Sequence, residues 1–173
     1  MAVSRRGGFR YWAERLNLPL KGTETHRGQA VETHVAAYLV GLGFDVKSQT
    51  TRAPFDMLID GCVRVDVKSA RYGDYIRKDA RKRTPQRTKG FAFGLNKVPP
   101  TCDLYVLCGV DEGNTVLWRY FVPATEARVR MLIITPNGKY SRFKNDVSYL
   151  RTLIAVRRDS PAHSSSGTSI GHK

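Results

Sequence analysis

The feature that most constrains the fold is a short segment, 63–68, in which valine alternates strictly with charged residues. Alternation with a period of two is typical of a strand with one buried and one polar face. The polar face of this strand carries Arg64, Asp66 and Lys68. Because Asp60-Gly61 is a turn signal, the preceding residues 55–59 are predicted to form the partner strand of a hairpin.

A helix, further strands and a closing helix are predicted around this hairpin. Apolar residues recur at three- and four-residue spacing over 25–42, which predicts an amphipathic helix ended by Gly41 and Gly43. Asn137-Gly138 predicts a second hairpin. The remaining predicted elements are strands at 44–48, 91–95, 104–110 and 116–122, a short helix at 124–131, hairpin strands at 132–135 and 139–143, and a helix at 147–156. The pattern therefore predicts an α/β fold with a central mixed β-sheet flanked by helices.

The chain divides into three parts by composition. Residues 1–22 mix arginine with aromatic residues and are interpreted as a basic N-terminal arm. Residues 23–156 hold all the predicted elements and are interpreted as one domain, since a chain of 173 residues is in the size range of a single core. Residues 157–173 are rich in Ser, Gly, His and Pro, which predicts a disordered tail.

The charge balance indicates a polyanionic partner. The chain carries 29 Lys and Arg against 15 Asp and Glu, a net charge of +14. Such a field attracts nucleic acid, although excess charge can also serve solubility alone. Residues 71–89 are predicted to be a mobile or ligand-ordered loop that contacts the phosphate backbone of DNA. Its eight basic residues are Arg71, Arg77, Lys78, Arg81, Lys82, Arg83, Arg87 and Lys89.

Cysteine usage and hydropathy predict an intracellular protein, cytoplasmic or nucleoid-associated. The three cysteines are odd in number and lack a Cys-x-x-Cys spacing, so we expect them to be reduced. The first ten residues lack an apolar signal region, and no run of about 18 apolar residues occurs. No membrane partner is expected.

The carboxylates of the first hairpin are candidate metal ligands. Magnesium prefers oxygen ligands, and Asp56, Asp66 and the Val67 carbonyl supply three. Mg²⁺, or Mn²⁺ in its place, activates water and neutralises phosphate charge in phosphodiester hydrolysis, while Lys68 would orient the water or stabilise the transition state. A shared site requires Asp56 opposite Asp66, which predicts a three-residue connection near Gly61 or a bulge.

These residues resemble the signature of the PD-(D/E)xK, or restriction-endonuclease-like, nuclease superfamily: an acidic residue, a short hairpin, then Asp or Glu-x-Lys. The matching residues are Asp56, Asp66 and Lys68, and Glu32 matches an acidic residue that the first core helix often adds. Phe55 separates Pro54 from Asp56, where the signature has Pro-Asp. The resemblance spans residues 28–122 and implies a restriction-endonuclease-like fold, metal-dependent DNA cleavage of homing or restriction type, and a homodimer.

The same residues fit two alternative functions. A Holliday-junction resolvase of the same superfamily fits the same motif. A nucleic-acid-binding module without catalysis would use the same basic surface, and Asp66 with Lys68 would then be an ordinary surface ion pair. Against the binding module, carboxylates beside bound phosphate repel it unless a cation lies between them.

Overall fold

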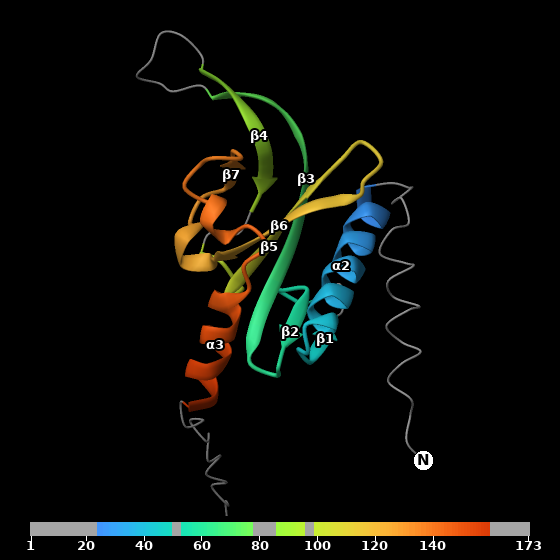
Figure 1. The fold of residues 1–173 in the computed structure, drawn as a ribbon, viewed down its shortest axis with the longest axis vertical. Coiled ribbons are helices and arrows are strands. Elements are labelled where there is room, and N and C mark those ends of the chain that lie inside the picture. Colours follow the sequence, from blue (N-terminus) through green and yellow to red (C-terminus); the bar gives the residue numbers. More distant parts are fainter. Residues whose placement is uncertain (1–23, 50–52, 78–85, 96–98, 160–173) are drawn as a thin grey trace, which may run out of the picture.

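The computed structural model describes residues 24–49, 53–77, 86–95 and 99–159 (Figure 1). Helix α2 comes first, the strands follow, and helix α3 closes the described chain. The elements are α2 (Glu24–Gly41), β1 (Val46–Ser48), β2 (Met57–Ile59), β3 (Val63–Arg77), β4 (Gln86–Gly94), β5 (Leu104–Val110), β6 (Val116–Pro123), the 3-10 turn η1 (Ala124–Glu126), β7 (Met131–Ile134), the 3-10 turn η2 (Ser141–Phe143) and α3 (Ser148–Asp159).

The sheet is mixed and is organised around the long strand β3. β3 pairs antiparallel with β2 over its first residues and parallel with β5 from Val65 to Arg71. It then pairs antiparallel with β4 from Tyr72 to Arg77. β1 extends the sheet beyond β2, β6 extends it beyond β5, and β7 pairs with β4. One strand thus connects the hairpin of charged residues to the far end of the molecule.

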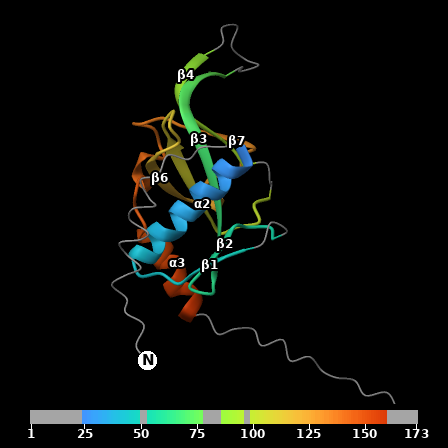
Figure 2. The same ribbon diagram turned by 90° about the vertical axis from the view of Figure 1, so that its right-hand side faces the viewer.

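Two apolar clusters lie on opposite faces of this sheet. α2 and α3 cover one face, where Val65 and Val67 of β3 pack with helix side chains such as Val35 and Leu150. Ala70 of β3 belongs to the other cluster, which β4, β6 and β7 complete. β5 is buried on both faces, as expected for a strand in the middle of a covered sheet. Figure 2 shows α2 lying across the sheet while β3 and β4 project beyond it.

Most elements confirm the sequence predictions. The predicted helix 25–42 corresponds to α2, and the predicted strands 104–110 and 116–122 correspond to β5 and β6. The mixed α/β architecture is confirmed. Hydrophobic periodicity predicts these segments correctly because each of them packs one or both of its faces against the core.

The predicted loop at 71–89 is wrong at both ends. β3 continues to Arg77, and β4 begins at Gln86, so these ends form a two-stranded antiparallel ribbon. The prediction failed because it relied on the absence of apolar side chains. Backbone hydrogen bonds between two strands do not require apolar side chains, so basic segments can also pair. Arg71, Arg77, Arg87 and Lys89 therefore lie on strands. The other four predicted DNA contacts, Lys78, Arg81, Lys82 and Arg83, lie outside the described residues.

The C-terminal part of the domain also differs from its prediction. The strand predicted at 132–135 pairs with β4 as β7 instead of forming a hairpin with 139–143. Residues 141–143 form η2, because Tyr140 and Phe143 pack onto the core. The helix predicted at 124–131 is reduced to η1.

Helix α3 extends to Asp159, beyond the predicted end at residue 156. Arg157 bonds to Asp103 and Arg158 to Asp60, and these contacts hold the last turn. The arm 1–22 and the rest of the predicted tail lie outside the described residues. Among the described helices, none combines the length and apolar character needed to cross a membrane.

Candidate active site

The β2–β3 hairpin has the predicted three-residue connection. Met57 lies opposite Val65 and Ile59 opposite Val63, so residues 60–62 form the turn. Asp60 and Gly61 both have positive φ, 49° and 69°, as tight connections of this kind require. The next position before Met57 is Asp56, whose amide donates to the Val65 carbonyl at 2.9 Å. The register prediction is confirmed.

Asp56 is fixed where the pairing of β2 stops. Its Oδ2 accepts a hydrogen bond from the Val67 amide at 2.7 Å. The carboxylate thus takes the place of the backbone carbonyl that a longer β2 would have offered to β3. A charge-assisted bond to a backbone amide holds the side chain in one orientation. The Asp56 side chain is 26% exposed, so it lies at the rim of the site.

Asp66 and Lys68 lie together on the polar face of β3. Asp66 is only 2% exposed. The Lys68 Nζ donates to Asp66 Oδ1 at 2.6 Å and to the Val67 carbonyl at 3.1 Å. The same Nζ lies 4.0 Å from Asp56 Oδ2. One ammonium group therefore contacts or approaches all three oxygen groups that the sequence assigned to a metal ion.

The electrostatics of the cluster show an excess of negative charge. Burial is the main cause that raises the pKa of Asp66, to about 6, and the neighbouring Asp56 raises it further, while Lys68 opposes the shift. The pKa of Glu32 on α2 is also raised, first by burial and then by the charge of Asp56. α2 therefore brings Glu32 into the field of the hairpin. Three carboxylates face one ammonium group.

This excess fits the donor chemistry of a divalent cation. Asp56, Asp66 and the Val67 carbonyl offer hard oxygen atoms, the ligands that magnesium prefers. Among the described residues, no group of three carboxylate, imidazole or thiol side chains is placed to hold a metal ion. The fit therefore rests on two carboxylates with a carbonyl, and on the unbalanced negative charge around them.

Tyr105 is a neighbour of the site that no motif in the sequence indicates. Tyr105 lies opposite Asp66 in the register between β3 and β5 and is 1% exposed. Burial is the main cause of its raised pKa, and the charge of Asp66 adds to it. Tyr105 and Asp66 are therefore buried neighbours on adjacent strands. Strand alternation places Tyr105 on one face of β5, but no local signal indicates that β5 pairs with β3.

A second charged cluster, also missed, lies near the start of β5. The Asp103 carboxylate accepts from the Arg64 amide at 2.8 Å and from its guanidinium at 2.8 and 3.1 Å. Arg157 of α3 adds a bond of 2.7 Å. Burial opposes ionisation of Asp103, but these bonds and charges outweigh it and lower the pKa of Asp103.

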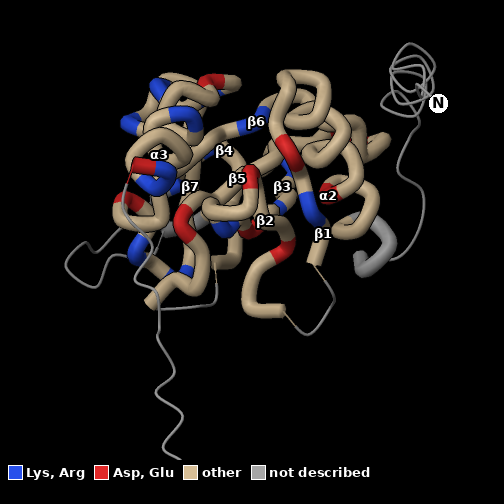
Figure 3. Tube along the Cα trace, turned by 90° about the horizontal axis from the view of Figure 1, so that it is seen from below, with Lys and Arg blue, Asp and Glu red and all other residues tan. Residues whose placement is uncertain are grey.

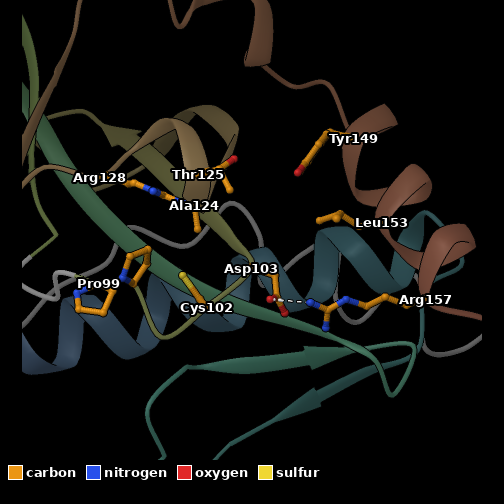
Figure 4. A pocket seen from close by; sticks show the side chains of 10 residues that line it. Pro99, Cys102, Asp103, Ala124, Thr125, Arg128, Tyr149, Leu153 and Arg157 are labelled. Atoms are coloured by element: carbon orange, nitrogen blue, oxygen red, sulfur yellow. Dashed lines mark hydrogen bonds and ion pairs between the residues drawn. The ribbon is translucent and has the colours of Figure 1, made fainter. Parts of the chain in front are cut away.

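Asp103 and Arg157 of this cluster line a cavity of about 580 Å³. Figure 4 shows the two side chains joined at the side of this cavity. Leu153 and Tyr149 of α3 face Ala124 and Cys102 across it. Asp103 thus fastens α3 to the sheet through Arg157.

Helix α2, the mixed sheet and the β2–β3 hairpin are arranged as in the restriction-endonuclease-like fold. Among solved structures, the chain is similar to the bacterial homing endonuclease I-Ssp6803I, with a TM-score of 0.56 and 14% sequence identity. The match covers 80% of this chain and 100% of that chain. The restriction-endonuclease-like fold expected from the sequence is confirmed. No protein-family model and no curated protein sequence matches the chain.

Proposed function

We propose that this chain is a magnesium-dependent endonuclease that hydrolyses phosphodiester bonds in DNA. The observation that carries the proposal is the meeting of Asp56, Asp66 and Lys68 at the point where β2 stops pairing with β3. The surrounding fold is that of a homing endonuclease, which favours a homing- or restriction-type substrate. Buried carboxylates with too little positive charge are costly unless a cation or a catalytic role compensates them.

The metal ligands in this proposal are Asp56, Asp66 and the Val67 carbonyl, and the Glu32 carboxylate on α2 adds negative charge near them. Mg²⁺, for which Mn²⁺ can substitute, would activate water and neutralise phosphate charge when bound. The hydrogen bond from the Val67 amide holds Asp56 in place. Tyr105 and the apolar residues around it exclude water from the inner side of Asp66.

Lys68 has two roles in this scheme. Its ammonium group offers hydrogen bonds in a partly buried position, where it can orient the attacking water. It also stabilises the negative charge that grows on the phosphate in the transition state. The contacts with Asp66 Oδ1 and the Val67 carbonyl hold the ammonium beside the scissile phosphate in this proposal.

DNA is the proposed partner because of the overall charge of +14. Figure 3 shows Lys and Arg spread over several elements of the described chain, with Asp and Glu among them. Such a distribution suits contacts along an extended phosphate backbone. We propose a homodimer, because cutting both strands of a duplex at a two-fold site requires two active centres.

The test is cleavage by the full chain with linear duplex DNA and with a four-way junction, in Mg²⁺, in Mn²⁺ and in EDTA. We expect cleavage of the duplex with either ion and none in EDTA. Cleavage of the junction alone would identify a junction resolvase instead. Tight DNA binding with no cleavage of either substrate would contradict the proposal and support a binding module without catalysis.

A further inference from the structure

The ribbon formed by β3 and β4 extends the catalytic strand beyond the body of the sheet. β3 residues Tyr72–Arg77 pair only with β4, after the pairing with β5 ends at Arg71. Figures 1 and 2 both show this ribbon projecting away from the two helices. A two-stranded ribbon is one of the few elements that fit the major groove of B-DNA, which is about 12 Å wide.

One face of the ribbon continues the catalytic face of β3. Side chains alternate along a strand, so Asp66, Lys68, Ala70, Tyr72 and Asp74 share a face. The packing agrees with this alternation, because Ala70 belongs to the same apolar cluster as Phe91. Tyr72 in turn packs edge-on against Phe91, with the ring centroids 5.3 Å apart. DNA placed against Lys68 would therefore also meet this face of the ribbon.

The charged residues of this face, Asp74, Arg87 and Lys89, are exposed. Asp74 lies directly opposite Lys89 in the register, and Arg87 lies two residues before Lys89 on β4. Within the described part of the chain, none of the three makes an ion pair. Tyr72 beside them is 49% exposed.

Asp74 decides which part of DNA this face contacts. A carboxylate among cations weakens binding to phosphate, so a surface that contacts only the backbone gains nothing from it. In the major groove a carboxylate accepts a hydrogen bond from the N4 amino group of cytosine, and lysine donates to O6 and N7 of guanine. Directly opposite residues of an antiparallel pair have Cα atoms about 4.5 to 5.5 Å apart. The pair Asp74 and Lys89 thus suits the two bases of one C·G pair.

We propose that the β3–β4 ribbon enters the major groove of duplex DNA and reads a C·G base pair through Asp74 and Lys89. The inference rests on the proposed function in that its ligand is duplex DNA, and it adds sequence specificity to it. Asp74 lies six positions after Lys68 along β3, a span of at most about 20 Å. The base pair read by the ribbon therefore lies within about six base pairs of the cut, at roughly 3.4 Å per base pair.

The experiment is selection of a randomised duplex library by gel shift with the full chain in EDTA, where binding is measured without hydrolysis. We expect wild type to enrich a C·G pair at one position. Asp74→Ala should reduce that preference by roughly 5- to 150-fold and leave the other positions unchanged. Asp74→Asn should change the preference to A·T, because asparagine pairs with adenine and Lys89 can donate to O4 of thymine.

Lys47→Ala is the matched control for Lys89→Ala. Lys47 is 65% exposed in its side chain and lies on β1, away from the ribbon, so its loss should weaken binding to all sequences equally. Lys89→Ala should in addition lose the preference for the C·G pair. Each variant is first shown to be folded by circular dichroism and thermal melting.

An enriched sequence that is the same in wild type, Asp74→Ala and Asp74→Asn would overturn the inference. So would a wild-type selection that enriches no sequence. The selection requires no cleavage, so its result does not depend on whether the chain is a nuclease. Conversely, a chain that cuts DNA without sequence preference would refute the proposed role of the ribbon but not the proposed nuclease function.

Discussion

Asp66 lies on β3 and Asp103 lies directly before the adjacent strand β5. Both side chains are largely shielded from water, yet their surroundings differ. The Asp103 side chain is 10% exposed and accepts bonds from Arg64 and Arg157. Asp66 is 2% exposed and has one cation, Lys68, with Asp56 close by. The pKa of Asp103 is lowered, whereas that of Asp66 is raised to about 6.

This difference separates a carboxylate that stabilises the fold from one that costs stability. Two guanidinium groups and a backbone amide compensate Asp103, and it ties α3 to β3 and β5. Asp66 is buried beside other carboxylates with incomplete compensation, an arrangement that lowers stability unless something else binds there. Under our proposal, the cluster around Asp66 is retained for catalysis and the cluster around Asp103 for structure.

The largest expected effect is the loss of cleavage in Lys68→Ala. The ammonium group acts on charge that develops in the transition state, so we expect cleavage to fall about 100- to 1000-fold. DNA affinity should change little, because one cation among 29 basic residues is removed. Rates and gel-shift affinities of Lys68→Ala are compared with those of Lys47→Ala, which removes the same charge from an exposed site. Equal cleavage rates in the two variants would exclude Lys68 from the chemistry.

Asp103→Asn should lower the stability of the fold more than Arg158→Ala does. It removes the charge from bonds to Arg64 and Arg157, and we expect the free energy of unfolding to drop by about 1.5 to 3 kcal/mol. Arg158→Ala breaks only a pair in which the arginine is 64% exposed, so it should cost less than about 1 kcal/mol. Urea denaturation gives the free energy of unfolding of wild type and of the two variants. If Asp103→Asn is no less stable than Arg158→Ala, Asp103 does not fasten α3.

The smallest expected effect is on acid stability. The folded pKa of Asp103 lies below its ordinary value of 3.8, so the unfolded chain binds this proton more readily. The stabilisation is complete above the unfolded pKa and is lost as the pH falls through the folded value. Between about pH 5 and about pH 2, wild type should therefore lose more unfolding free energy than Asp103→Asn. Equal losses of the two proteins in parallel urea titrations would show that Asp103 is not stabilised in its charged form.

The hairpin that carries Asp56, Asp66 and Lys68 could be predicted because residues close together in the sequence determine it. Alternating valines fix the faces of β3, and the requirement that two carboxylates share a face predicts the three-residue turn that is observed. The helix that carries Glu32 follows from its apolar stripe in the same way. Hydrophobic periodicity records which side of an element is buried.

The ribbon and the Asp103 cluster could not be predicted from local patterns. The strands of the ribbon are polar, and their pairing depends on contacts between Tyr72 and Phe91 that are distant in sequence. Asp103 meets Arg157 from the other end of the domain. The turn predicted at Asn137-Gly138 forms, but the hairpin predicted around it does not, because β7 pairs with β4, whose Phe93 is buried.

The most direct test of the central claim is cleavage of duplex DNA in Mg²⁺ by Asp66→Asn and Asp103→Asn, measured side by side at a temperature where both are folded. Each substitution removes one buried carboxylate charge and keeps the size of the side chain. Our account predicts that Asp66→Asn is inactive while still binding DNA, and that Asp103→Asn cuts at a rate close to wild type. Full activity in folded Asp66→Asn would contradict the account.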